Sequence, residues 1–338
     1  MSLSVCVVGV GFMGQMHART ISESESARLA AVVDLNVEVG QSVARQYGAK
    51  HYSDIADALA DPGIDAYIVA LPDRRHVDAS CAVLEAGKPV LLEKPMAHSL
   101  AAARQIALAA ERSAARLMVG QILRFDPRYQ GAARAVAEGQ IGEPIHAKAG
   151  RISGRVVGTR MNGTSSVLFY LGIHDVDAIQ WVTGRSIRRV YSRAVSKLMP
   201  SLGVASEDVI LSVVEFEDGS AGQLFNGWTR TATDPVGVDG RLEVHGTEGL
   251  VEIDVRDHGL KIYGRDGLVI PDGLHWPEVN GRIRGDLAAE VRHFVRAVID
   301  DSPFVISVAE AMRAVAVNDA ILRSVESDKP EEVERVAV

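Results

Sequence analysis

The chain has 338 residues, 47% of them hydrophobic, which is typical of about two folded domains and excludes disordered and fibrous proteins. Its 36 Lys and Arg residues against 44 Asp and Glu give a formal charge of −8, which excludes the basic surface that nucleic-acid and anionic-membrane binding requires. Two cysteines are too few for a disulfide framework or a zinc site. No apolar run approaches the roughly 18 residues that span a bilayer. We therefore expect a cytoplasmic protein without metal or membrane partners.

Residues 4–119 alternate short apolar runs with longer Ala-rich stretches that have helical spacing. The apolar runs predict strands at Ser4–Val8, Leu29–Val33, Ala66–Ala70, Pro89–Leu92 and Arg116–Val119. Apolar strands linked by helices indicate a parallel sheet that is covered on both faces. We therefore predict an α/β, doubly wound domain over residues 1–122, with ligands at the carboxyl ends of its strands.

After Pro144 the strands become longer and more alternating, and tight turns join them. Val209–Phe216 with Ala221–Asn226, and Leu242–His245 with Leu250–Asp254, are predicted hairpins. The spacing also predicts helices at Val167–Val182, Asp286–Ile299 and Val308–Ser327. Residues 123–338 are therefore predicted to form an α+β domain with a large, open, mostly antiparallel sheet, and the terminal helices could pack back on the first domain.

A dinucleotide fingerprint, Gly9-Val10-Gly11-Phe12-Met13-Gly14, follows the first predicted strand and opens a helix. Gly9 permits the tight turn, Gly11 lets the backbone approach a pyrophosphate, and Gly14 allows close helix packing. The phosphates would lie on the N–H groups of Phe12 and Met13 at the helix N-terminus. Asp34 ends the second strand, where a carboxylate accepts hydrogen bonds from a ribose diol and repels a 2′-phosphate, so NAD is favoured over NADP.

Glu93-Lys94-Pro95 follows the predicted strand Pro89–Leu92 at the edge where a nicotinamide would lie. An ammonium group beside an apolar pocket and a nicotinium ring loses hydration and is repelled, which lowers its pKa toward a value useful for proton transfer. Lys94 is therefore the leading acid/base candidate, and Glu93 could orient either Lys94 or the ring. The alternative is a solvent-exposed loop.

These motifs, with Leu71-Pro72-Asp73, His76 and Gly172-Ile173-His174-Asp175, resemble the glucose-fructose oxidoreductase, inositol dehydrogenase and rhizopine-catabolism (Gfo/Idh/MocA) family over nearly the whole chain. The resemblance implies a Rossmann domain, a second domain whose open sheet lines the substrate cleft and makes a homodimer or homotetramer, and NAD(P)-dependent oxidation of a sugar, cyclitol or related alcohol. It implies that Lys94 is catalytic, that the peptide bond before Pro95 is often cis, and that the cofactor contacts are Leu71, Pro72, His76, Glu93 and Gln121.

His174 is the second candidate for chemistry. Tyr170 lies four residues before it on a predicted helix, so both side chains could point into one cleft. The family commonly has Asp where Tyr170 stands, and this chain departs there. A phenol can donate or relay a proton, but Tyr170 could equally be a packing residue in an apolar run.

Substrate contacts are also predicted for a few polar residues outside these motifs. Arg124, with Asp126, could touch substrate or form an interdomain ion pair, and Arg160 and Asn162 could reach sugar hydroxyls from a loop. Trp228 could stack on a sugar ring or simply be buried.

The sequence thus predicts hydride exchange between NAD and a secondary hydroxyl of a sugar, inositol or related polyol, with Lys94 as acid/base assisted by His174 and Tyr170. Two alternatives stay open. One is an NAD-dependent glycosidase that oxidises its sugar transiently, and the other is a non-catalytic dinucleotide-binding protein.

Overall fold

The computed structural model describes residues 2–265 and 267–336, which fall into two compact units. The first unit comprises residues 2–122 and 274–312, and the second comprises 123–273 (without 266) and 313–336. The sequence predicts a boundary at residue 122, with terminal helices that could pack back on the first domain. Residues 274–312 group with the first unit, because the helix Gly285–Ile299 packs against the helix Phe12–Ser22.

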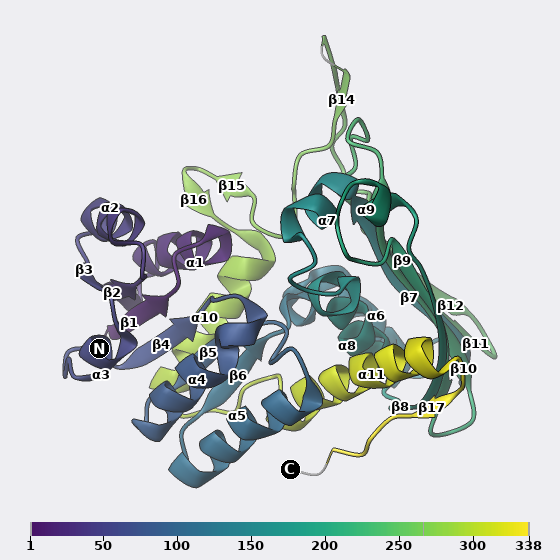
Figure 1. Cartoon of the computed structure of the whole chain (residues 1–338), viewed down its shortest axis with the longest axis horizontal. Helices are drawn as coiled ribbons and strands as arrows, with labels where there is room; N and C mark the ends of the chain where they lie inside the picture. The colour runs from purple at the N-terminus through teal and green to yellow at the C-terminus, as the bar shows by residue number, and fades with distance from the viewer. Residues whose placement is uncertain (1, 266, 337–338) are drawn as a thin grey trace. The chain divides into compact units, whose positions relative to one another are not determined.

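A six-stranded parallel sheet with the order β3-β2-β1-β4-β5-β6 forms the centre of the first unit (Figure 1). Its strands are β1 (Leu3–Val8), β2 (Ala27–Val33), β3 (Lys50–Tyr52), β4 (Ala66–Val69), β5 (Val90–Glu93) and β6 (Leu117–Gly120). Every residue of β1, β4, β5 and β6 is buried, as the apolar runs predicted. The short β3, which is half-exposed, was not predicted.

Helices connect these strands and cover the sheet. They are α1 (Phe12–Ser22), α2 (Val37–Tyr47), α3 (Ile55–Leu59), the 3₁₀ turn η1 (Asp73–Arg75), α4 (His76–Glu85) and α5 (Leu100–Ser113). The C-terminal part of the unit adds β15 (Glu278–Val279), β16 (Arg282–Ile283) and α10 (Gly285–Ile299). Helix α4 packs against α5, β4 and β5, whereas α1 packs against β1, β2 and α10. The predicted doubly wound fold is confirmed, and the carboxyl ends of its strands share one edge.

A seven-stranded sheet with the order β12-β11-β7-β10-β9-β8-β17 forms the second unit. Its strands are β7 (Pro144–Gly154), β8 (Ile187–Val195), β9 (Val209–Phe216), β10 (Ala221–Arg230), β11 (Val238–Gly246), β12 (Leu250–Asp254) and β17 (Glu331–Glu332). The two predicted hairpins are present as antiparallel pairs. Strand β7 lies between β11 and β10 and is parallel to β10, so the sheet is mixed but mostly antiparallel.

The remaining elements of the second unit are mainly helical. They are η2 (Ile122–Phe125), α6 (Pro127–Ala137), α7 (Arg155–Met161), the π-helical turn η3 (Leu168–Gly172), α8 (Ile173–Thr183), α9 (Leu198–Ser201), the hairpin β13 (Ile262–Gly264) and β14 (Gly267–Val269), and α11 (Val308–Ser327), which begins in the first unit. The predicted helix Val167–Val182 is therefore a π-helical turn followed by an α-helix. Within the described residues, no helix is both long and apolar enough to cross a membrane.

Candidate active site

Three glycines give the turn between β1 and α1 its shape. Gly9 has φ +85°, and a Cβ there would lie 2.8 Å from Leu71 Cδ2. A Cβ on Gly14 would lie 1.8 Å from the carbonyl oxygen of Gly9, so the helix can approach the strand only without a side chain there. A Cβ on Gly11 would meet no atom within 4 Å, so this position faces open space. The turn thus has the tight, close-packed and accessible positions that a pyrophosphate-binding loop needs.

The N-terminus of α1 borders that space. Gly11 is its N-cap residue and provides no side-chain hydrogen bond to the first turn. The first N–H groups of a helix have no partner within the helix, so those of Phe12 and Met13 can bind an anion. The open position at Gly11 and these N–H groups together fit a dinucleotide pyrophosphate.

Asp34 follows β2 directly and is half-buried beside the glycine turn. Its Oδ2 accepts a 2.9 Å hydrogen bond from the Val10 N–H, and its Oδ1 accepts one of 2.8 Å from the Asn36 N–H. These two bonds fix the carboxylate at the carboxyl edge of the sheet. Each oxygen retains a second lone pair for a ribose hydroxyl.

Lys94 follows β5 at the same edge, and the Lys94–Pro95 peptide bond is cis, as the family resemblance implied. His76 is buried and joins this turn to the one after β4. Its Nδ1 lies 2.9 Å from the carbonyl oxygen of Pro95, and its Nε2 lies 2.7 Å from that of Leu71. The ring therefore holds the two turns together, so His76 positions the Lys94 backbone.

A buried cluster of three titratable side chains contacts the backbone of Lys94. His17 Nε2 from α1 is 2.8 Å from Glu93 Oε1, and Glu93 Oε2 accepts a 3.2 Å hydrogen bond from the Lys94 N–H. Glu290 of α10 completes the cluster, since ligand atoms of all three side chains lie within 4.8 Å of one another. His and Glu are also metal-ligand types, and the expectation of no metal stays a prediction.

The pKa values of the two carboxyl groups of this cluster are shifted in opposite directions. Burial raises the pKa of Glu93, but the hydrogen bond with His17 and the charges of His17, Lys94 and His76 together outweigh it, so the pKa lies below its ordinary value. Burial raises the pKa of Glu290 well above its ordinary value, and the Glu93 carboxylate raises it further. Glu93 is therefore the more acidic of the two carboxyl groups, and Glu290 is the one that more readily keeps its proton. Neither His17 nor Glu290 was predicted from the sequence.

Gln121 follows β6 at the same edge and is 1% exposed. Among the described residues, neither its amide oxygen nor its amide nitrogen has a hydrogen-bond partner. A buried amide without partners costs free energy unless a ligand satisfies it. This orphaned group fits the predicted contact with the nicotinamide ribose.

In the second unit, His174 is half-buried on α8, and a buried ion pair follows it directly. Asp175 accepts hydrogen bonds from Arg151 of β7, at 2.9 Å from the terminal guanidinium nitrogen, and from Asn226 of β10, at 2.6 Å. Burial lowers the pKa of Arg151, but the Asp175 carboxylate outweighs it and the pKa lies above its ordinary value. These contacts attach the start of α8 to two strands and so fix the backbone of His174.

Tyr170 lies in the π-helical turn η3, not on one α-helix with His174. Its hydroxyl oxygen accepts a 2.9 Å hydrogen bond from Arg160, and its ring packs 6.0 Å from that of Trp228. Trp228 is fully buried and donates to the Glu207 carbonyl, so it is a core residue. Single π-helical turns occur frequently at functional sites.

The structure gives Arg124 and its neighbour Asp126 structural partners within the second unit. Arg124 is 5% exposed and forms a two-bond ion pair with Asp177 of α8, at 2.8 and 2.9 Å, inside the second unit. Asp126 caps α6 and pairs with Arg128. Asn162 is exposed and ends α7 in a left-handed conformation, with φ +47°.

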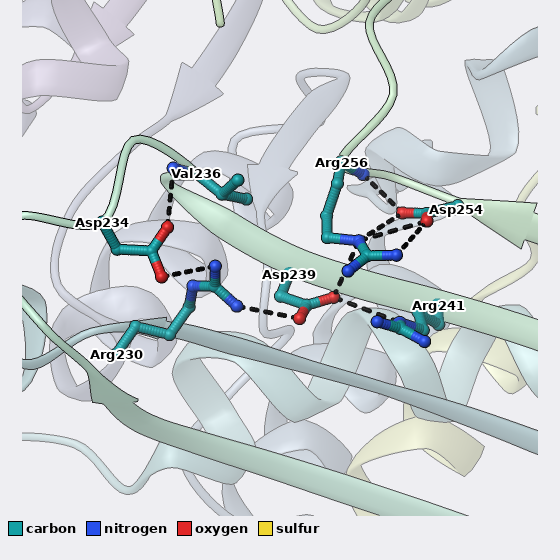
Figure 2. Close-up of polar contacts among 7 residues, drawn as sticks. All are labelled: Arg230, Asp234, Val236, Asp239, Arg241, Asp254 and Arg256. Carbon is teal, nitrogen blue, oxygen red and sulfur yellow. Dashed lines mark hydrogen bonds and ion pairs between the residues drawn. The ribbon is translucent and has the colours of Figure 1, made fainter. Parts of the chain in front are cut away.

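A network of arginines and aspartates fixes the segment between β10 and β11 (Figure 2). Asp239 lies at its centre, 2.8 Å from Arg230, 3.3 Å from Arg241 and 3.5 Å from Arg256. Asp234, within the segment, pairs with Arg230 at 2.5 Å and accepts from the Val236 N–H at 3.0 Å. The network gives residues 231–237 a defined position without regular secondary structure.

Two sequence models of one family match the chain. An oxidoreductase family with an NAD-binding Rossmann fold matches residues 3–121, and the GFO/IDH/MocA C-terminal domain matches residues 129–252. The scyllo-inositol 2-dehydrogenase (NAD(+)) of Bacillus subtilis strain 168 is 29% identical over 332 residues, which cover 96% of this chain and 94% of that protein.

Solved structures of similar proteins share the fold of this chain. GenD2 from gentamicin A biosynthesis, in complex with NAD, has a TM-score of 0.84 at 27% identity and covers 98% of this chain and 97% of that one. The scyllo-inositol dehydrogenase from Lactobacillus casei with NAD(H) and scyllo-inositol has a TM-score of 0.86 at 21% identity. The match covers 98% of this chain and 99% of that one, and it shows the shared fold. The predicted family, fold, oxidoreductase class and NAD cofactor are confirmed. The chain belongs to the GFO/IDH/MocA oxidoreductase family, whose amino-terminal domain is an NAD-binding Rossmann fold.

Proposed function

We propose that the protein exchanges a hydride between NAD and a secondary hydroxyl of an inositol or a related polyol or sugar. The observation that carries this proposal is the position of Lys94, which follows β5 at the carboxyl edge that also holds the glycine turn and Asp34. The names of the relatives support the substrate class, because several are inositol 2-dehydrogenases at 28–29% identity over nearly the whole chain.

NAD supplies the hydride acceptor when it is bound. In this proposal the N–H groups of Phe12 and Met13 hold its pyrophosphate, Asp34 accepts from the ribose diol, and the Gln121 amide contacts the nicotinamide ribose. Glu93 and His76 hold the backbone around Lys94 in place.

Lys94 takes the hydroxyl proton in the oxidation direction and returns it in the reduction direction. His174, which α8 and the Arg151–Asp175 pair fix in the second unit, is proposed as the second proton-transfer group. Tyr170, whose hydroxyl oxygen accepts a hydrogen bond from Arg160, is proposed to donate or relay a proton through its phenol.

Assembly into a homodimer or homotetramer through the sheet of the second unit also belongs to this proposal. On β9 the alternate residues Leu211 and Val213 are 51% and 54% exposed, and Tyr191 of the neighbouring β8 is 39% exposed. An apolar strip on a sheet face is suited to covering by another protein surface. The cytoplasmic location stays a prediction.

The experiment is a panel of inositols, sugars and other polyols with NAD, followed by the absorbance of the reduced nicotinamide. The proposal expects NADH with at least one cyclitol or sugar. A protein that binds NAD but forms no NADH with any member would contradict it. Tightly retained NAD together with cleavage of a glycoside would favour the glycosidase, and binding without turnover would favour the non-catalytic alternative.

A further inference from the structure

An exposed aromatic side chain lies beside the phosphate-binding turn. Phe12 is the first residue of α1, and its side chain is 66% exposed although its backbone N–H belongs to the proposed pyrophosphate site. The Trp276 ring packs edge-on against it, with centroids 6.0 Å apart and an interplanar angle of 70°. Large exposed apolar side chains beside a ligand site are suited to covering by the ligand.

The backbone of the segment that carries Trp276 is firmly attached to α10. The Leu274 carbonyl accepts a 2.9 Å hydrogen bond from the Asp286 N–H, and the His275 carbonyl accepts one of 3.0 Å from the Leu287 N–H. The His275 ring lies 3.0 Å from the buried Asp286 carboxylate. These contacts occupy the first turn of α10 and fix the residues on the N-terminal side of Trp276.

The segment is also attached to α1 itself. Arg19 donates to Glu278 at 2.8 Å and to the Gly281 carbonyl at 3.1 Å, and Glu23 accepts from the Ile283 N–H at 2.6 Å. The hairpin of β15 and β16 thus lies along the helix whose N-terminus binds the phosphates. Trp276 is therefore held beside Phe12 from both sides along the chain.

We propose that Phe12 and Trp276 form an aromatic wall at the phosphate-binding turn that slows the dissociation of NAD. A fixed aromatic wall limits the access of water to the charged pyrophosphate and so strengthens its bonds to the N–H groups. This inference rests on NAD binding by the first unit and does not require that a polyol be the substrate.

The test measures NADH dissociation from the full-length protein by stopped-flow fluorescence, and NAD affinity by calorimetry, without any polyol. Trp276→Ala and Phe12→Ala are each expected to speed dissociation about three- to tenfold, while association changes little. Trp276→Phe keeps an aromatic ring and is expected to remain within about twofold of the unmodified protein. Leu108→Ala is the matched control, because Leu108 is a 45% exposed apolar residue on α5.

Each outcome decides the proposal. Unchanged dissociation in both alanine variants would overturn it, as would an equal effect in Leu108→Ala. If Trp276→Ala alters the unfolding temperature, the NADH dissociation rate of Phe12→Ala decides the proposal, because the Phe12 side chain is exposed. A protein that binds no NADH overturns the wall and the cofactor assignment together, whereas intact NADH binding without polyol turnover overturns only the proposed function.

Discussion

His17 Nε2 and Glu93 Oε1 lie 2.8 Å apart in the interior of the first unit, and this contact connects α1 to the end of β5. The helix proposed to bind the cofactor phosphates and the turn that carries Lys94 are therefore joined through one buried polar contact. Because burial strengthens such a contact, the two parts of the site keep a fixed relation to each other.

Replacing the third member of this cluster should change how stability depends on pH. The pKa of Glu290 is raised in the folded protein, chiefly by burial, so its contribution to stability is complete below its unfolded pKa and is lost as pH rises through the folded value. In Glu290→Gln this loss disappears. Thermal unfolding as a function of pH measures this effect. From about pH 5 upward, the stability of the variant relative to the unmodified protein should increase with pH. A constant difference across this range would contradict the raised pKa of Glu290.

Gly11 and Gly14, two of the three glycines of the turn, should respond differently to the same added methyl group. Gly14→Ala places a Cβ 1.8 Å from a backbone oxygen, so we expect a destabilisation of about 3 kcal/mol or more. Gly11→Ala meets no protein atom within 4 Å, so stability should stay within about 0.5 kcal/mol. Its methyl group would nevertheless enter the pyrophosphate space, and NAD affinity should fall at least about tenfold. Denaturant unfolding and calorimetry measure the two effects, and normal NAD affinity in Gly11→Ala would argue against this binding position.

Removing one partner of the Arg151–Asp175 pair should destabilise the protein strongly, whereas replacing both partners with apolar residues should destabilise it little. Asp175→Ala leaves a buried guanidinium group without its charge partner, at a cost of about 3–5 kcal/mol. The double variant Arg151→Met/Asp175→Leu removes both charges and should recover most of that loss. Denaturant unfolding of the single and double variants tests this. A loss below about 1 kcal/mol in Asp175→Ala would mean that the pair does not hold α8.

The network around Asp239 should be weaker, because its side chains are partly exposed. Asp239→Asn removes the charge that three arginines share and should cost about 1 kcal/mol, and the loss should shrink at high salt. Asp234→Asn, which affects one arginine, is the milder comparison. Unfolding at low and high ionic strength measures both. A loss that is independent of salt would indicate packing in place of charge pairing.

Much of the first unit could be predicted because its strands are apolar runs and its cofactor turn is a local motif. Strand β3 could not, since its half-exposed Lys50–Tyr52 shows no apolar run or alternation. The parallel pairing of β7 with β10 also escaped prediction, because it joins segments distant in sequence without a turn signal.

The candidate site was predicted where its residues belong to sequence motifs. Glu290 is an acidic residue on an amphipathic helix, and such residues normally face solvent, so only the fold reveals its burial beside Glu93. The same holds for Trp276, whose relation to Phe12 depends on the packing of α10 against α1.

The most direct test of the proposed function follows the hydride itself. A polyol from the panel, carrying deuterium at the carbon that bears the reacting hydroxyl, is incubated with the protein and NAD, and the reduced cofactor is analysed by mass spectrometry. We predict one deuterium in each NADH formed, and a Lys94→Ala variant that still binds NAD but transfers the label about 10² to 10⁴ times more slowly. Unlabelled NADH, no NADH from any cyclitol or sugar, or full transfer in Lys94→Ala would contradict the account.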